Sequence, residues 1–391
     1  MATADASHAG IEDFYHPQTA RTSMRQTQTT STHFWKPLLT SALVLLSGCH
    51  MPSAANAHGP HRVVTDLSGR SVSIPAQINR IACLTGACYE KAFLVGAGNK
   101  VIARATAGAP WMARTNPRSP QIPMILNSHQ PNVEELLNLK PDVVFFWDNP
   151  AVLDTLGKNG LTALVPQPEK NTPTSIAAFT ERMKNEVRFY GQVVDGDAQK
   201  RAEDWCSYYD QRVQYVLQRT QNIPEEKKTK VYYLRGPSPL TTHGAEANIT
   251  WYGEMAGAHM VVKDSGLKNI SQVSMEDMFH WNPDVIFVGR QYSPDLVLND
   301  ARWKNIAAVR NKRVYVIPDG VFYWDSGSEG VLLLEFMAQK LYPDLFRDLD
   351  MKHEVMTYYA RFYRYALPED EAGKMLHGAG PDGTRSNPLN N

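Results

Sequence analysis

The sequence predicts an α/β fold of two lobes, each built on a parallel sheet, joined by a long α-helical backbone. Three observations support this prediction. Strand-like apolar runs alternate with helical segments in both halves of the chain, which is typical of parallel sheets covered on both faces. Almost fifty residues between the halves have helical periodicity instead. The stretch NVEELLNLKPDVVFFW (132–147) also aligns without a gap with SMEDMFHWNPDVIFVG (274–289), at an offset of 142 residues, so we interpret the halves as copies of one unit.

Composition excludes several classes of protein. The 391 residues are enough for two domains, and 43% apolar with 20% charged residues fits a globular chain. Lys and Arg together number 40, as do Asp and Glu, so no basic field indicates a nucleic-acid partner.

Residues 1–57 are predicted to be an N-terminal extension followed by an export signal. The apolar run 38–46 is too short to span a bilayer as a helix but suits the centre of a secretory signal. A signal of normal length begins at Met24, which we expect to be the true start.

Two cleavage sites compete. Leu46-Ser47-Gly48-Cys49 resembles a bacterial lipobox, in which Cys49 becomes the lipid-bearing first residue, whereas the A-x-A site at 55–57 would release a soluble protein. We favour the lipobox, so the expected location is the periplasm with a lipid anchor in a membrane.

Four cysteines are too few for a disulfide framework in an exported chain of this size. If Cys49 is acylated, an odd number remains: Cys83, Cys88 and Cys206. Cys83 and Cys88 lie five residues apart across a predicted strand-to-helix turn. A disulfide between them and two buried thiols both remain open.

The first lobe is predicted over residues 58–173. It begins with a β-hairpin at 63–75 that turns at Ser-Gly. Apolar runs bounded by turn residues then predict strands at 80–84, 100–104, 143–147 and 162–166. Helices lie between them, including one at 133–139.

A helical linker is predicted over residues 174–222. One apolar stripe begins at Ile176, and a second runs from Ala202 to Val216. Asp197 is the expected N-cap of the second helix, which ends before Pro224.

The second lobe is predicted over residues 223–350. The alternation of strands and helices restarts there, so both lobes are expected to be Rossmann-like. The predicted strands are 230–235, 285–289 and 313–318, and the predicted helices include 251–262 (with the start of a strand), 275–281 and a core helix at 331–342. A Tyr-rich C-terminal helix (351–377) and a disordered tail (378–391) follow.

Ligands of open parallel sheets bind beyond the carboxyl ends of the strands. Arginine and aromatic side chains gather at this edge, which suits a bulky, partly planar anion, because Arg offers a fixed fork for oxygens and rings offer apolar contact. The candidate ligand-binding residues are Arg104, Trp111, His129, Trp147, Arg235, His243, Arg290, Tyr323 and Trp324.

His129 and His243, one from each lobe, are also candidate metal ligands. The sequence has no dense His cluster of the kind that a bare Zn²⁺ or Mn²⁺ site requires. It also has no G-x-S-x-G, H-E-x-x-H or phosphate-binding Gly loop, so we predict that the chain is not an enzyme.

The paired acids of the repeated stretch have separate roles. Asn132 and Ser274 are expected to cap helices, with Glu135 and Asp277 reaching back to complete capping boxes. This leaves Glu134 and Glu276 pointing outward, one per lobe. From the sequence alone, each acid is explained by its favourable place near the positive end of a helix. Because there is one in each lobe, they would also form a two-point docking device for a two-fold partner that carries Arg.

The chain resembles the helical-backbone (class III) substrate-binding proteins of bacterial ABC importers, the group that serves ferric siderophores, haem and vitamin B12. The resemblance covers roughly residues 60–365. It is carried by LSGC, RIACL…AFLVGAG, NVEELLNLKPDVVFF, the helical linker, MEDMFHWNPDVIFVG and WDSGSEGVLLLEFMAQKLYP.

The resemblance implies a monomeric receptor without an intrinsic cofactor, which delivers its ligand to an inner-membrane permease and its ATPase. Glu134 and Glu276 match the acids that dock onto permease arginines in that family. FYWDSGSEGVLLLEFMAQKLYPDLF is most similar to the iron-complex branch, so the expected ligand is a ferric siderophore or another iron complex. The alternatives are a nickel or cobalt chelate completed by His129 or His243, or a bare transition metal. Vitamin B12, haem and an enzyme on the same scaffold rank lower.

Overall fold

The computed structural model describes residues 60–105, 109–168 and 172–385. Residues from Ala57 to Asn391 cluster as one unit, and all elements below belong to it. The expected export signal, with Met24, Cys49 and the A-x-A site, lies outside the described residues.

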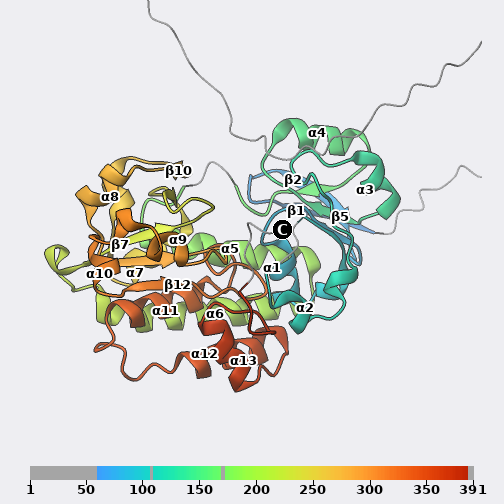
Figure 1. The fold of residues 1–391 in the computed structure, drawn as a ribbon. Coiled ribbons are helices and arrows are strands. Elements are labelled where there is room, and N and C mark those ends of the chain that lie inside the picture. Colours follow the sequence, from blue (N-terminus) through green and yellow to red (C-terminus); the bar gives the residue numbers. More distant parts are fainter. Residues whose placement is uncertain (1–59, 106–108, 169–171, 386–391) are drawn as a thin grey trace, which may run out of the picture. The chain divides into compact units, whose positions relative to one another are not determined.

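The first lobe contains a four-stranded parallel sheet of order β4-β3-β5-β6, of which β5 is labelled in Figure 1. Its strands are fully or nearly fully buried, because helices cover a parallel sheet on both faces. An antiparallel hairpin, β1 (His61–Thr65) and β2 (Ser71–Pro75), precedes it as predicted. The strands are β3 (Ile81–Cys83), β4 (Val101–Arg104), β5 (Val143–Phe145) and β6 (Ala163–Leu164). The helices are α1 (Cys88–Leu94), η1 (Gly98–Lys100), α2 (Met112–Thr115), η2 (Ser119–Gln121), α3 (Val133–Leu139) and α4 (Pro150–Lys158).

The second lobe contains a four-stranded parallel sheet of order β12-β11-β7-β9. A short antiparallel pair, β8 (Thr241–His243) and β10 (Ile270–Gln272), lies outside this sheet. The strands are β7 (Thr229–Leu234), β9 (Ala258–Met260), β11 (Val285–Val288) and β12 (Val314–Val316). The helices are η3 (Glu225–Lys227), α7 (Asn248–Met255), η4 (Val261–Ser265), α8 (Met275–Trp281), α9 (Asp295–Leu298), η5 (Ala301–Trp303), α10 (Ala307–Arg310) and α11 (Gly330–Leu341).

The two sheets have the same topology. The sequence repeat pairs β5 with β11, and the neighbouring strands follow the same order. The first strand of each four-stranded sheet lies beside the repeated one, and the second strand of that sheet lies beyond it. The last strand of each lobe lies on the opposite side of the repeated strand. The repeat noticed in sixteen residues therefore extends to the whole arrangement of both sheets.

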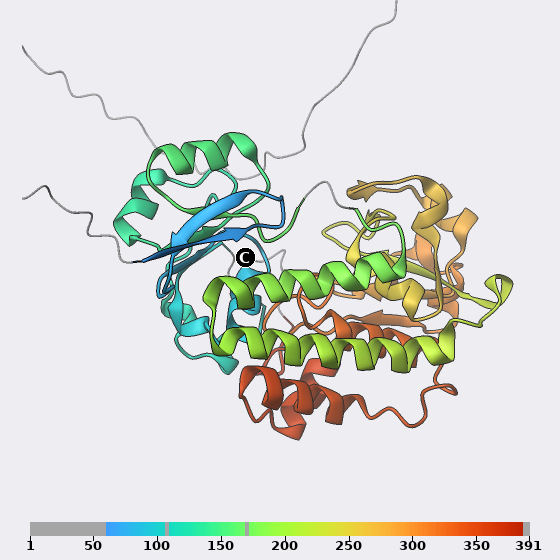
Figure 2. The ribbon, with the colours of Figure 1, turned by 180° about the vertical axis from the view of Figure 1, so that it is seen from behind.

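Two long antiparallel helices, α5 (Ile176–Val194) and α6 (Asp197–Thr220), form the helical backbone and run side by side in Figure 2. Ser175 caps α5 by accepting a bond from the backbone N–H of Ala178. The N-cap of α6 is Gly196, with φ of 63°, and not Asp197 as predicted. Asp197 is the first helical residue, where a carboxylate still lies near the positive end of the helix.

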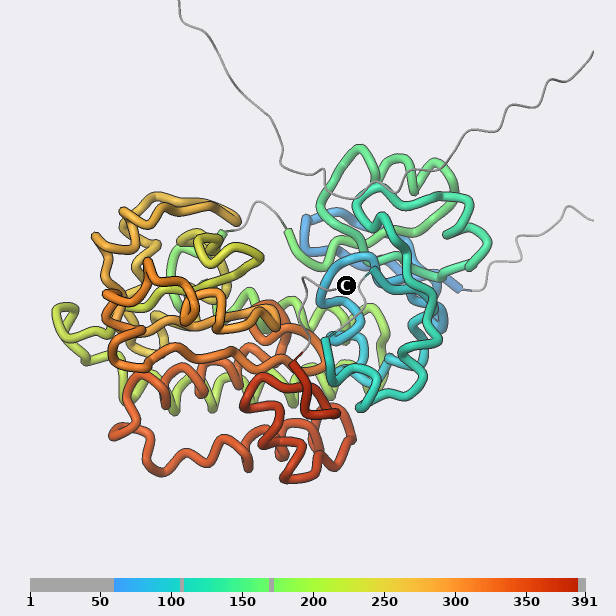
Figure 3. The backbone as a smooth tube through the Cα atoms, viewed as in Figure 1, coloured from blue at the N-terminus to red at the C-terminus, as the bar shows by residue number. Residues whose placement is uncertain are grey.

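The C-terminal segment is not one helix. It divides into α12 (Met351–Tyr358), the π-helical turn η6 (Tyr359–Tyr363) and α13 (Glu369–Leu376). Arg364 has a left-handed backbone with φ of 53°, and Pro368 cannot continue a helix, so the helical pattern breaks between them. The red end of the tube in Figure 3 belongs to this segment. An ion pair connects the segment to α2, with Nη2 of Arg114 2.7 Å from Oε1 of Glu371.

One hydrophobic cluster runs through both lobes, the helical backbone and the C-terminal segment. It includes Phe145 of the first sheet, Trp205 of α6, Phe287 of the second sheet and Tyr359 of η6. Cys83 and Cys88, whose state the sequence left open, form a disulfide, and Cys206 is a buried free thiol. Among the described helices, none is long and apolar enough to cross a membrane.

Candidate functional site

The carboxyl edges of the two sheets meet. Gly86, just after β3, lies where a Cβ would be 3.2 Å from the ring of Phe322, which follows β12. The backbone N–H of Trp111 donates to the carbonyl of Gly320 at 3.2 Å. The loops that leave the two sheets therefore touch, and residues at the strand ends lie around a common boundary.

Arg290 belongs to a charged cluster that the second lobe builds after β11. Its Nε donates to Asp325 at 2.8 Å, its Nη2 donates to Ser326 at 2.7 Å, and its guanidinium lies 4.4 Å from the ring centre of Tyr323. The hydroxyl of Tyr233 donates to the same Asp325 oxygen at 2.5 Å.

The charges of Arg290 and Asp325 compensate each other. Burial alone would raise the pKa of Asp325, but Arg290 holds that pKa below its usual range. Burial would likewise lower the pKa of Arg290, and the carboxylate of Asp325 reverses this and raises it. Asp325 stands in the WDSGSEG stretch, yet nothing in the sequence marked it as the partner of Arg290.

His243, at the end of β8, lies against this cluster. Its ring centre is 5.6 Å from that of Tyr233, and its Nε2 is buried without a hydrogen-bond partner among the described residues. Burial lowers the pKa of His243 to about 4, with Arg290 and Arg235 acting in the same direction and Asp325 opposing them. The imidazole is therefore neutral at pH 7. Of the residues predicted from the sequence, the structure brings together His243, Arg235, Arg290 and Tyr323.

Arg235 lies beside the cluster and forms no ion pair with a carboxylate of the described residues. It directly follows β7, its Nη1 reaches only the carbonyl of Gly236 at 3.5 Å, and its Nε is buried without a partner in the described part of the chain. In the first lobe, Arg104 ends β4 and is 9% exposed, and its burial lowers the pKa of its guanidinium. The edge therefore offers cationic groups from both lobes.

The aromatic residues predicted at this edge divide into two groups. His129 and Trp147 stack in the first lobe, with ring centres 5.2 Å apart and planes within 5°. Trp111 and Trp324 are 0% exposed and belong to the hydrophobic core, so their faces are covered. The indole Nε1 of Trp147 is buried and has no partner in the described residues.

Asp319 is a second carboxylate that the sequence analysis missed. It is 5% exposed, and its burial raises its pKa well above the usual value. The negative charge of Asp325 raises this pKa further. Asp319 therefore holds its proton more tightly than an ordinary carboxyl group.

The described residues contain no group of three or more His, Cys, Asp or Glu side chains that is arranged to hold a metal ion. His129 and His243 interact instead with Trp147 and Tyr233.

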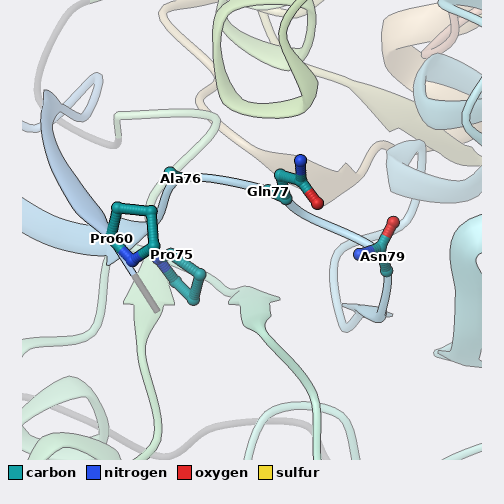
Figure 4. A pocket seen from close by; sticks show the side chains of 5 residues that line it. All are labelled: Pro60, Pro75, Ala76, Gln77 and Asn79. Atoms are coloured by element: carbon teal, nitrogen blue, oxygen red, sulfur yellow. The ribbon is translucent and has the colours of Figure 1, made fainter. Parts of the chain in front are cut away.

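A hollow of about 440 Å³ lies away from the edge, beside β2 (Figure 4). None of its lining residues carries a charge, so it does not suit an ionic ligand. They are Pro60, Pro75, Ala76, Gln77 and Asn79.

The two predicted docking acids are exposed in the first turns of α3 and α8. Ser274 and Asp277 form the expected capping box, with reciprocal bonds of 2.7 and 3.1 Å. Asn132 accepts bonds from the N–H groups of Glu134 and Glu135, but within the described bonds the carboxylate of Glu135 does not return to Asn132. The capping-box prediction is therefore wrong for Glu135, and both acids of the first copy are free of helix capping.

Known proteins share this architecture. The molybdate-binding protein MolA of Haemophilus influenzae is 27% identical over 353 residues, which is 84% of this chain and 99% of the relative. Its molybdate-bound structure superposes with a TM-score of 0.70 and 26% identity, covering 78% of this chain and 99% of that one. A periplasmic solute binding protein from Veillonella parvula has a TM-score of 0.71 and 28% identity, covering 82% of this chain and 97% of that one.

A third relative is the uncharacterised ABC transporter substrate-binding lipoprotein YvrC of Bacillus subtilis. It is 24% identical over 330 residues, or 80% of this chain and 98% of the relative. The family profile described as "Periplasmic binding protein" matches residues 81–321, which is more than half of the chain. The chain therefore belongs to the periplasmic binding protein family, whose members bind solutes and are not enzymes.

Proposed function

We propose that the chain is the receptor of an ABC importer for an anionic, metal-containing solute, which it binds between the carboxyl edges of its two sheets and delivers to a membrane permease and its ATPase. The observation that carries the proposal is the set of N–H donors at this edge. Arg104 and Arg235 supply cationic groups from the two lobes, and the buried Nε of Arg235 and Nε1 of Trp147 have no partner in the described residues.

A donor-rich edge suits an acceptor-rich ligand. Arg has only donors, and the indole N–H is also only a donor, so both require oxygen acceptors when buried. Asp325 already compensates Arg290, so this carboxylate is not available to pair with Arg235.

A small metal oxyanion of the molybdate class is the ligand that we favour. The burial of Trp111 and Trp324 removes two of the aromatic faces that a large planar chelate would use. The ligand named for the relative from Haemophilus influenzae supports the same class.

A ferric siderophore or another iron complex is the second candidate. The stacked pair of His129 and Trp147 supports it, because Trp147 is half-buried and His129 is exposed, and together they offer a ring surface to a planar chelate. In a nickel or cobalt chelate, His129 or His243 would complete the coordination.

Titration calorimetry of the purified chain distinguishes these ligands. The panel consists of molybdate, tungstate, sulfate, ferric desferrioxamine, a ferric catecholate and bare Ni²⁺. We expect tight binding of molybdate or tungstate, and Arg235→Gln should weaken it by about tenfold or more, since one charge-assisted bond is lost. Arg302→Gln is the control, because Arg302 is exposed and its one ion pair within the described residues is with Asp300. Binding of Ni²⁺ alone, abolished by His243→Ala, would contradict an anionic ligand.

Glu134 and Glu276 are proposed to dock the loaded receptor onto arginines of the permease. The double variant Glu134→Ala/Glu276→Ala should abolish uptake of the ligand while leaving its affinity unchanged. Glu135→Ala is the matched control beside the first acid, since both are exposed on α3. A fall in ligand affinity in the double variant would show that these acids belong to the binding site or the fold.

A lipid anchor at Cys49 remains a proposal from the sequence, and one relative carries the name lipoprotein. Labelled palmitate should be incorporated into the wild-type chain and not into Cys49→Ala. Release of an unlabelled soluble chain by the wild type would support cleavage at 55–57 instead.

A further inference from the structure

The exposed faces of α3 and α8 carry more than the two acids. Leu137 is 41% exposed and Phe279 is 53% exposed, and they occupy the same position of the sequence repeat, 142 residues apart. Eight large apolar side chains are this exposed in the described residues, and the other six lie outside both copies of the repeat.

Each apolar side chain shares a helix face with a docking acid. Leu137 follows Glu134 by three residues, and Phe279 follows Glu276 by three residues. Residues three apart on a helix are surface neighbours, so each lobe presents one carboxylate beside one apolar side chain. We call these two pairs, Glu134 with Leu137 and Glu276 with Phe279, the twin patches.

The rest of the two helices is shared as well, which makes the twin patches equivalent in their surroundings. Leu136 and Met278 are buried on the inner face of their helices, and each helix ends at a residue in the left-handed conformation, Lys140 and Asn282. Figure 1 shows α3 on the first lobe and α8 on the second lobe, at similar height in that view. Each copy of the repeat thus has an outward-facing apolar side chain that does not pack in the hydrophobic core.

We infer that Leu137 and Phe279 are the apolar centres of two equivalent docking contacts, each flanked by its acid, and that the partner presents two matching sockets with a cationic rim. This inference rests on the proposed function, because the occupant to which we commit is the paired membrane-spanning half of the importer. Charge and duplication both point to such a partner, since two negative groups on two copies of one helix match a two-fold surface with two basic residues.

The acids and the apolar side chains would contribute differently. Exposed charges guide association and are screened by salt, whereas apolar contacts buried at the centre of an interface carry most of the affinity and are not screened. Phe279 offers the larger area, and the partner is therefore expected to contact the second lobe more strongly than the first.

Co-sedimentation with spheroplasts of the source bacterium tests the inference. The probe is the fluorescently labelled chain, with unlabelled wild-type chain as competitor to define saturable binding. We expect Phe279→Ser to weaken saturable binding by about tenfold, Leu137→Ser somewhat less, and the two together more than either alone. Leu345→Ser is the matched control, because Leu345 is 43% exposed and lies outside the repeat.

Two further variants separate the inference from the proposed function. If Glu134→Ala/Glu276→Ala loses binding while Leu137→Ser/Phe279→Ser binds like wild type, docking is purely ionic and the apolar role is wrong, but the receptor function stands. If both double variants bind like wild type, neither patch docks the partner and the proposed docking function falls with the inference. In high salt, the wild type should retain a larger share of its binding than Leu137→Ser/Phe279→Ser, and an equal loss in both would also overturn the apolar role.

Discussion

At the scale of residues, the two copies of the repeat share the residues that bond to the backbone and differ in the residues at the ligand-binding edge. Asp142 accepts bonds from the backbone N–H groups at 79 and 80, at 2.7 and 2.9 Å, and its counterpart Asp284 accepts one from Lys230 at 3.0 Å. Five residues later the copies diverge to Trp147 and Gly289. A Cβ at Gly289 would lie 2.1 Å from the hydroxyl of Tyr233, so only glycine lets that hydroxyl reach Asp325.

The neutral state of His243 has a measurable consequence. Because its pKa is about 4 in the folded protein and about 6.5 in an unfolded chain, acid favours the unfolded state, which binds the proton first. This loss is absent above pH 6.5 and grows as the pH falls toward 4. It amounts to about 2 kcal/mol between pH 7 and 4.5.

Urea unfolding of the ligand-free chain at these two pH values tests this. The difference in unfolding free energy between wild type and His243→Gln should shrink by about 2 kcal/mol on acidification, because the variant lacks the titrating ring. A difference that stayed constant between the two pH values would contradict this, because it would mean that the ring of His243 titrates alike in the folded and the unfolded chain.

At the scale of elements, the paired helices α3 and α8 differ in how their N-caps are completed. Asp277 returns to the backbone N–H of Ser274, whereas Glu135 makes no such bond to Asn132 within the described residues. Asp277→Ala should therefore lower the free energy of unfolding by about 1 kcal/mol, and Glu135→Ala by much less. Thermal unfolding of the two variants measures the difference directly, and equal losses would mean that Glu135 also caps its helix in solution.

The disulfide between Cys83 and Cys88 closes a very short loop at the end of β3. Since the stabilisation from closing a loop grows with its length, a separation of five residues predicts only about 2 kcal/mol. Cys83→Ala/Cys88→Ala should thus remain folded and lose about that amount in denaturant unfolding. Reducing agent should destabilise the wild type and leave the double variant unchanged.

The elements were largely predictable, and the site only in part. The repeat, the alternation of strands and helices and the two long helical stripes are local patterns, and they predicted the α/β class and most strands. The partnership of Arg290 with Asp325 depends on which loops meet within the second lobe, and the burial of Trp111 and Trp324 depends on which loops pack over them. A single sequence has no pattern that predicts contacts between distant loops. Charged and aromatic residues at the strand ends therefore indicated the edge of the sheets, but not which of their side chains can contact a ligand.

At the scale of the whole described unit, the lobes are joined by buried polar bonds as well as by the shared core. Glu90 of α1 accepts a bond from the N–H of Ser328 at 3.1 Å and one from the hydroxyl of Tyr363 at 2.6 Å. It therefore links the first lobe to the second lobe and to the C-terminal segment at a fully buried point. Burial raises the pKa of Glu90, and the bonds from Tyr363 and Ser328 oppose this rise.

Because Glu90 and the core cluster connect every part of the unit, we expect the two lobes to unfold together rather than one after the other. Tyr363→Phe removes one donor from a buried carboxylate and should cost about 1–3 kcal/mol in both lobes alike. Native-state hydrogen exchange in increasing urea reports the opening free energy of amides in β5 and β11 separately. In the wild type these two values should agree, and in Tyr363→Phe they should fall by equal amounts. If the amides of β11 exchanged at a urea concentration at which those of β5 stayed protected, the lobes would unfold as independent units. The buried bonds of Glu90 would then constrain the movement of one lobe against the other on ligand binding less than we expect.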